Sequence, residues 1–190
     1  MPPEDRTDHQ HVIDIIAADP WAMDILWLVR ALRLPDWAIG AGFVRGLVWD
    51  RLCGFAQRTP LNDIDVVYFD PSDTSRAGER AAESELAAAR ILEAWSVRNM
   101  ARMHLKNGDE PYRNTTDAIG HWLETPTAVA VTMADDGTLR LLAPHGVADL
   151  LAGRVRPTPS GRRKPAEYHA RVTAKAWPSR WPKVVVEGLT

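Results

Sequence analysis

The sequence predicts an α+β fold, a small mixed β-sheet with flanking helices, and three observations carry this prediction. Helical and strand-like segments follow one another without the regular alternation of βαβ units. The chain has 190 residues, 45% hydrophobic and 25% charged, which suffices for the core of one ordinary domain. Two strand-like runs flank Asp136-Gly137, a dipeptide that favours the tight turn of an antiparallel hairpin.

Capping residues, prolines and apolar periodicity place each element along the chain. Asp19 suits a helix N-cap, Pro20 fits the first helical position, and Pro35 ends the same helix. The expected helices are residues 19–35, 43–54, 76–95, 117–124, 146–155 and 166–177. The expected strands are residues 37–42, 63–70, 96–105, 127–133 and 139–144, and residues 156–165 are expected to form a linker. The tryptophans in apolar patterns, expected in the core, are Trp27, Trp37, Trp49 and Trp95.

Charge is divided unevenly along the chain. Residues 154–190 hold nine Lys or Arg against two Glu, a net charge of +7, so the rest of the chain carries −9. We therefore expect a core of residues 1–153 and a basic helical extension of residues 154–190 packed on it within a single domain. A basic extension on an acidic core fits a phosphate-bearing partner, and it equally fits a solvated helical tail.

The single cysteine, Cys53, excludes an intrachain disulfide and a zinc cluster of cysteines. The N-terminal segment "MPPEDRTDHQ" is polar and acidic, unlike a signal peptide, and no apolar run approaches the ~20 residues that a membrane span needs. We therefore expect a cytoplasmic protein without a membrane partner.

Three small residues lie between a strand-like segment and a helix. Gly40, Ala41 and Gly42 put backbone N–H groups beside a helix N-terminus, where the helix dipole also favours an anion. The segment is not a Walker A loop, because no Gly-Lys-Ser/Thr follows, and it is not GxGxxG, because residue 45 is Arg. It predicts a phosphate site, and the alternative is a plain tight turn.

A second motif begins the strand-like run "DIDVVYFD". Side chains two residues apart share one face of a strand, so Asp63 and Asp65 point to the same side while Ile64 and Val66 face the core. Their Cα atoms lie roughly 7 Å apart, which lets both carboxylates bind one or two divalent cations. Oxygen ligands of this kind suit Mg²⁺. The alternative is a solvent-facing strand edge.

The two motifs share a layout of strand, small-residue turn, helix, loop and strand with D-x-D. In this layout "AGFVRGLVWDRL…NDIDV" resembles the "GGxVRDxLL…DxD" head of CCA-adding enzymes and bacterial poly(A) polymerases. Ala41, Gly42 and Arg45 stand at the positions of the two glycines and the arginine, whereas Gly46 replaces the aspartate. Further segments, including "WSVRNMARMHLKNGDEPY" and "LLAPHGVADLLAGRVRPTP", are similar to a bacterial family of small predicted nucleotidyltransferases of the DNA polymerase β-like superfamily.

The resemblance implies a polymerase β-like fold and a Mg²⁺-dependent nucleotidyltransferase. Asp63 and Asp65 would be catalytic and would hold one or two Mg²⁺ ions. An NTP, ATP by default, would lay its phosphates against the "GAG" turn and Arg45. A nucleoside monophosphate would pass to an acceptor, and pyrophosphate would leave. The acceptor stays open among a small molecule, a protein side chain and RNA.

Related enzymes carry a third carboxylate on a later strand, and here this chain departs from the pattern. Alternation along "WSVRNMARMH" puts Val97, Asn99 and Ala101 on one face, so Asn99 takes the expected third catalytic position. Asparagine can bind a metal or orient a substrate, but it cannot accept a proton. The candidates to replace it, in or near the following loop, are His104, Asp109 and Glu110.

Three further cations complete the expected nucleotide site: Arg98, Arg102 and, in the basic extension, Lys164. The alternative for Arg98 and Arg102 is the solvated face of an edge strand. Two rival functions also stay open. One is a catalytically degenerate nucleotide- or nucleic-acid-binding module, and the other is a toxin-like enzyme that modifies a protein or RNA partner.

Overall fold

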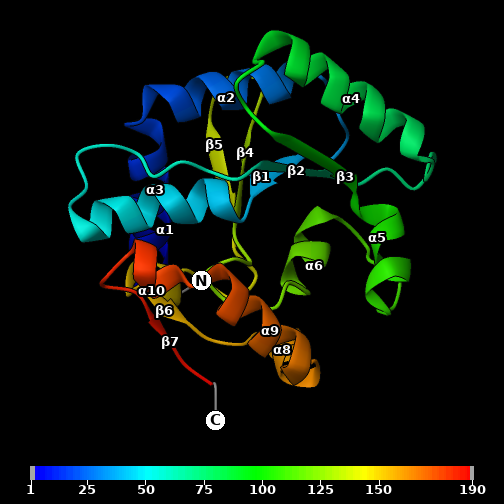
Figure 1. Cartoon of the computed structure of the whole chain (residues 1–190). Coiled ribbons are helices and arrows are strands. Elements are labelled where there is room, and N and C mark those ends of the chain that lie inside the picture. The colour runs from blue at the N-terminus through cyan, green and yellow to red at the C-terminus, as the bar shows by residue number, and fades with distance from the viewer. Residues whose placement is uncertain (1–2, 189–190) are drawn as a thin grey trace.

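The computed structural model describes residues 3–188, with side chains from residue 7 onward (Figure 1). The helices are α1 (Pro3–Ala17), α2 (Pro20–Ala31), α3 (Gly42–Cys53), α4 (Arg76–Ala89), α5 (Met100–Asn107), α6 (Thr115–Gly120), α7 (Ala148–Leu151), α8 (Pro159–Arg163), α9 (Pro165–Lys175) and α10 (Trp177–Arg180). The strands are β1 (Ala38–Gly40), β2 (Ile64–Tyr68), β3 (Trp95–Asn99), β4 (Ala130–Met133), β5 (Leu139–Leu142), β6 (Arg154–Val155) and β7 (Val185–Val186). Within this part of the chain, no helix combines the length and the apolar character needed to cross a bilayer.

Five strands form one mixed sheet in the order β3-β2-β1-β4-β5. β1 is antiparallel to both β2 and β4, and β4 pairs with β5 in an antiparallel hairpin. β3 is parallel to β2, so a crossover is required between them, and α4 provides it (Figure 1). The predictions of an α+β fold and of a hairpin around Asp136-Gly137 are confirmed.

Alternation along the strands divides the core between the two faces of the sheet. Ile39, Val66 and Val131 belong to a large apolar cluster that includes residues of α1, α2, α3 and α4. Their neighbours Ala38 and Val67 belong to a second cluster, with residues of α5 and α6. In Figure 1, α4 lies above the sheet and α5 and α6 lie below it. Helices therefore cover both faces of the central strands.

In the turn from β1 into α3, Gly40 has little space for a side chain and Ala41 has a strained backbone. A Cβ on Gly40 would lie 2.7 Å from the Cη2 atom of Trp122, so a larger residue would require Trp122 to move. Ala41 has φ 51° and ψ −114°, a conformation that is unfavourable for a residue with a Cβ, and α3 begins directly after it. One strained residue thus separates the end of the central strand from the N-terminus of α3.

The C-terminal helices pack against α3. The ring of Trp49 contacts Trp177 and Trp181 edge-on, with ring centroids 6.0 and 5.3 Å apart. The indole N–H of Trp181 donates to Asp50 Oδ1 at 2.6 Å, and all four side chains are buried. The boundary expected at residue 153 falls between α7 and β6.

Several local predictions differ from the observed structure. The expected strand 96–105 is wrong beyond residue 99, because Asn99 caps a helix, α5, that begins there. The expected linker 156–165 contains α8, and the expected helix 146–155 is limited to α7. Trp27, expected in the core, is 44% exposed and lies under the guanidinium of Arg30.

Candidate functional site

A small cavity of about 130 Å³ lies where the β1–α3 turn, the start of β2 and the helices α9 and α10 meet. The side chains and turn residues that matter for its chemistry are Ala41, Gly42, Arg45, Asp63, Asp65, Arg171, Lys175 and Arg180. The start of β2 supplies carboxylates, whereas α3, α9 and α10 supply cations. The cavity therefore joins opposite charges from segments that are far apart in the sequence.

The N-terminus of α3 forms one wall. Its N-cap, Ala41, offers no side-chain hydrogen bond to the first-turn N–H groups, and both Ala41 and Gly42 line the cavity. These N–H groups and the positive end of the helix dipole favour an anion. A Cβ on Gly42 would meet only Leu61 and Arg45, at 3.7 and 3.9 Å, so no contact within the protein requires glycine there. The free space beside Gly42 would allow a phosphate to approach the backbone.

Sheet register brings the carboxylates to this turn. Asp65 lies opposite Gly40 of β1 on one side and opposite Ser96 of β3 on the other. Asp65 is half-buried, Asp63 is exposed, and both line the small cavity. Burial raises the pKa of Asp65, the charge of Asp63 raises it further, and a hydrogen bond from Ser96 opposes the rise. The two carboxylates thus repel each other in the absence of a cation.

This pair fits a hard divalent cation such as Mg²⁺. A cation between Asp63 and Asp65 would remove the repulsion that raises the pKa of Asp65. Among residues 3–188, no group of three or more Asp, Glu, His or Cys side chains is placed to hold a metal. Water and phosphate oxygens would therefore complete the coordination, as they commonly do for Mg²⁺.

Arg45 places a buried cation at the cavity. Its side chain is 6% exposed, lies over the rings of Trp49 and Trp177, and donates from Nη1 to Thr127 Oγ1 at 2.7 Å. Burial lowers the pKa of Arg45 to about 10, an effect that the charge of Glu124 partly offsets. Its Nε atom is buried without a hydrogen-bond partner in the described structure. An anion in the cavity would compensate this desolvated charge.

The basic extension supplies cations other than the one expected. Arg171, Lys175 and Arg180 line the small cavity. Lys164 instead lines a larger cavity, where its Nζ donates to Asp109 Oδ1 at 2.9 Å. Which residue of a basic helix reaches the carboxylates depends on how that helix docks, and the sequence carries no signal for this.

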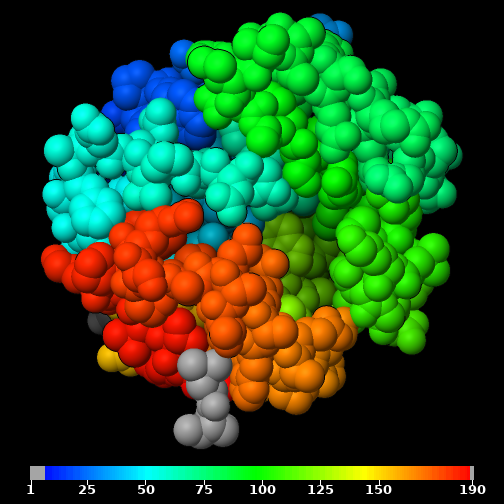
Figure 2. All heavy atoms as spheres, in the orientation of Figure 1, coloured from blue at the N-terminus to red at the C-terminus, as the bar shows by residue number. Residues whose placement is uncertain are grey.

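The larger cavity, about 430 Å³, lies on the other side of Asp65. It shares Ala41, Asp65 and Arg171 with the small cavity, and Figure 2 shows it as the hollow between α9 (orange) and α5 (green). Arg98 lines it, and Arg98 also forms an ion pair of 2.6 Å with Glu83 on α4. Asp65 therefore lies between the two cavities.

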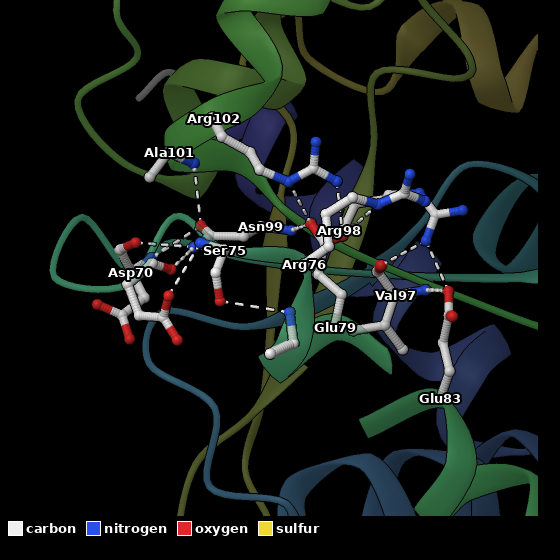
Figure 3. Close-up of polar contacts among 12 residues, drawn as sticks. Asp70, Ser75, Arg76, Glu79, Glu83, Val97, Arg98, Asn99, Ala101 and Arg102 are labelled. Carbon is white, nitrogen blue, oxygen red and sulfur yellow. Dashed lines mark hydrogen bonds and ion pairs between the residues drawn. The ribbon is translucent and has the colours of Figure 1, made fainter. Parts of the chain in front are cut away.

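The structure does not bring Asn99 to the carboxylates. Its side chain is 0% exposed, its Oδ1 accepts from the N–H groups of Asp70 and Ala101, and its Nδ2 donates to the carbonyls of Asp70 and Asp73 (Figure 3). All of these bonds are internal, so Asn99 has a structural role at the N-terminus of α5. Parallel register instead places Ser96 beside Asp65, on the opposite face of β3 from the one that we expected.

Arg102 belongs to the same internal network. It pairs with Glu79 of α4 at 2.5 Å, and Glu79 also accepts the backbone N–H of Asn99 (Figure 3). Of the candidates for a third carboxylate, Asp109 lines the larger cavity but is engaged by Lys164 and by the Tyr112 hydroxyl. His104 packs against the Tyr112 ring, and Glu110 is exposed.

Sequence reasoning missed Glu124 and Thr127, which lie just before β4 and line the larger cavity. Glu124 is completely buried and pairs with Arg171 of α9 at 2.7 Å. A lone Glu in "HWLETPT" gives no signal of burial, since exposed glutamates are the rule.

Structural comparison finds the same architecture in solved proteins. A structure determined by NMR and described as a CCA-adding enzyme head domain is 28% identical, has a TM-score of 0.84, and matches over 94% of this chain and 95% of that one. The Thermotoga maritima CCA-adding enzyme complexed with tRNA is 16% identical with a TM-score of 0.58, and a CCA-adding enzyme in an apo form is 15% identical with a TM-score of 0.55. This chain spans only 42% and 45% of those two enzymes. These likenesses confirm the polymerase β-like fold.

Sequence comparison gives the family. No curated protein sequence matches the chain significantly. A family model described as nucleotidyltransferase matches residues 28–186, which include the glycine turn, both aspartates and the C-terminal helices that close the small cavity. Because the match spans most of the chain and every wall of that cavity, the chain belongs to this nucleotidyltransferase family.

Proposed function

We propose that the protein is a Mg²⁺-dependent nucleotidyltransferase that moves a nucleoside monophosphate from an NTP, ATP by default, to an acceptor and releases pyrophosphate. One observation carries the proposal: Asp63 and Asp65 line the same cavity at the N-terminus of α3 as Arg45, Arg171 and Arg180. Carboxylates alone repel a nucleotide, and cations alone repel a metal, so a cavity with both suits a metal-bound nucleotide. Family membership supports the same chemistry.

In this proposal the protein positions the triphosphate and neutralises its charge. The first-turn N–H groups of α3 and Gly42 contact phosphate oxygens, while Arg45, Arg171 and Arg180 stabilise the charge that develops on the leaving pyrophosphate. Mg²⁺ held by Asp63 and Asp65 would act as a Lewis acid on the phosphate oxygens. The acceptor atom bonds to the α-phosphorus, the bond to pyrophosphate breaks, and the acceptor proton leaves to water.

A second candidate is a nucleotide-binding module without transfer activity. The observation that favours it is Ser96, which occupies the position beside Asp65 on β3 and offers a hydroxyl rather than a carboxylate. Such a module would bind Mg²⁺ and the phosphates of a nucleotide at the small cavity and leave the nucleotide intact.

Pyrophosphate release from ATP, GTP, CTP and UTP in the presence of Mg²⁺ separates these functions. We expect release that EDTA abolishes and that Asp63→Asn or Asp65→Asn lowers by about 100-fold or more. Glu85→Gln, an exposed change on α4, is the control for removal of one negative charge and should leave the rate unchanged. Nucleotide binding without release would favour the module, and the lack of both would contradict both candidates.

A further inference from the structure

The larger cavity contains buried polar groups that the protein leaves without hydrogen bonds. Glu124 is 0% exposed, and within the described structure neither of its carboxylate oxygens accepts a hydrogen bond. Arg171 Nε lies 2.7 Å from Glu124 Oε1, but this ion pair lacks the alignment of a hydrogen bond. The Nδ1 atom of His121, in the same cavity, is also buried without a hydrogen bond and lies 3.6 Å from Asp109 Oδ2. Since buried polar atoms are normally satisfied, these groups have unused capacity to hydrogen-bond a water molecule or a ligand in the cavity.

The remaining walls limit the size and polarity of that ligand. Val67, Met103 and Trp122 form an apolar surface, and the volume of about 430 Å³ is that of a small-molecule site. Lys164, at the end of α8, donates to the carbonyl of Asn107 at 2.6 Å and to Asp109 at 2.9 Å. These contacts tie the end of α8 to the last residue of α5 and to the segment that follows, and a long polymer would have to break them to enter.

We propose that the larger cavity binds the acceptor and that the acceptor is a small polyhydroxylated molecule with one apolar face, a sugar or a related polyol. Its hydroxyl groups donate to Glu124, and its carbon–hydrogen face packs on Trp122 and Met103. This inference rests on the proposed function, because it assigns the second substrate of the same site.

The residues that line both cavities bring the two substrates together in this proposal. Ala41, Asp65 and Arg171 line both cavities, so a triphosphate in the small cavity and an acceptor in the larger one meet at Asp65. One hydroxyl oxygen of the acceptor forms the new bond to the α-phosphorus, the bond to pyrophosphate breaks on the opposite side, and the hydroxyl proton leaves to water. Holding both substrates in this geometry is the contribution of the two cavities.

Competition between water and glycerol tests the inference, with glycerol as the probe because it is a minimal polyol. Full-length protein, Mg²⁺ and α-labelled ATP in a glycerol solution yield AMP by attack of water and glycerol-linked AMP by attack of glycerol. We expect Glu124→Ala to lower the ratio of glycerol-linked AMP to AMP about tenfold, because a hydrogen bond to a charged group is lost. Met103→Trp, which fills the cavity, should lower the ratio similarly and should not alter the Kd of ATP by more than about twofold.

The controls distinguish a loss of acceptor binding from unfolding and from a loss of ATP binding. Glu85→Gln, at an exposed position of α4 that lines neither the small nor the larger cavity, should leave the ratio unchanged. Glu124→Gln keeps the shape of the side chain and replaces Glu124→Ala if thermal melting shows that the alanine variant unfolds. A ratio unaffected by Glu124 and Met103 overturns the inference, as does transfer to a tRNA transcript alone. A weaker Kd of ATP in Met103→Trp also overturns it, because the cavity would then hold the nucleoside. No pyrophosphate release by the wild type removes the proposed function itself.

Discussion

The cavity around Asp65 and the network around Asn99 lie on neighbouring strands and contain the same kinds of side chain, yet their hydrogen bonding differs. In the network, Glu79 accepts from Arg102 and from the N–H of Asn99, and Asn99 makes four internal hydrogen bonds (Figure 3). In the small cavity, burial raises the pKa of Asp65 and lowers the pKa of Arg45, whose Nε has no hydrogen-bond partner in the described structure. A polar cluster with its bonds satisfied internally stabilises the fold, whereas an unsatisfied one is prepared for a ligand.

The largest expected effect tests this contrast through stability. Asn99→Ala removes four internal hydrogen bonds, one of which caps α5, and it should lower the free energy of unfolding by about 2–3 kcal/mol. Asp65→Asn should not lower it, because the repulsion from Asp63 is relieved. Urea denaturation followed by circular dichroism measures both values.

Nucleotide binding provides the reverse comparison for the same two variants. Asn99→Ala that remains folded should bind ATP and Mg²⁺ with the wild-type Kd, whereas Asp65→Asn should lose Mg²⁺ binding. If a stable Asn99→Ala variant no longer bound Mg²⁺, Asn99 would belong to the metal site, and the distinction between a structural network and a binding cavity would be wrong.

A smaller effect separates cations of the basic extension by their location. Arg180 lines the small cavity, whereas Arg162 is exposed on α8 and lines neither cavity. Arg180→Ala should raise the Kd of ATP about fivefold, because one exposed charge-assisted contact is lost, and Arg162→Ala should leave it unchanged. Isothermal titration calorimetry at fixed salt measures both; equal effects would mean that net charge, not position, attracts the nucleotide.

A change of about 1 kcal/mol is expected from the strained residue of the turn. Ala41→Gly should stabilise the protein by about that amount, because glycine adopts φ 51° without steric cost. Ala152, with φ −81°, is the matched control, and Ala152→Gly should destabilise by about 0.5–1 kcal/mol. If both substitutions destabilise, the turn is not strained.

The smallest expected effects concern pH and have opposite signs in the two regions. The pKa of Asp65 is raised by burial and Asp63, so its stabilising contribution is present below the pKa of the unfolded state and is lost as pH rises through the folded-state pKa. The pKa of Asp70 is lowered by hydrogen bonds from Ser72, so its contribution is present above the unfolded-state pKa and is lost as pH falls through the folded-state pKa.

Stability curves between neutral pH and about pH 4 measure this difference. As pH falls, the wild type should gain stability relative to Asp65→Asn and lose it relative to Asp70→Asn. Added Mg²⁺ should lower the pKa of Asp65 and leave that of Asp70 unchanged. If the free energies of unfolding of Asp65→Asn and Asp70→Asn, each relative to the wild type, changed with pH in the same direction, the contrast between the two regions would be contradicted.

Local chemistry predicted the parts of the site that lie close together in the sequence. The small residues before α3, the D-x-D pair and the strand that carries it follow from steric rules and alternation, and the pair lines one cavity as a shared strand face implies. Asn99 could not be placed correctly, because the register between β2 and β3 decides whether Ser96 or Asn99 lies beside Asp65. Glu124 and Arg171 meet only through the docking of α9, and no local pattern encodes that contact.

The packing of Trp177 and Trp181 on Trp49 also orders events during protein synthesis. The ribosome makes the chain from the N-terminus, so Asp63 and Asp65 leave the exit tunnel before Arg171 and Arg180 exist. Until α9 and α10 dock on α3, the carboxylates face water and the small cavity lacks a wall. In a nascent chain the small cavity therefore gains its basic wall only after α9 and α10 have been made and have docked on α3.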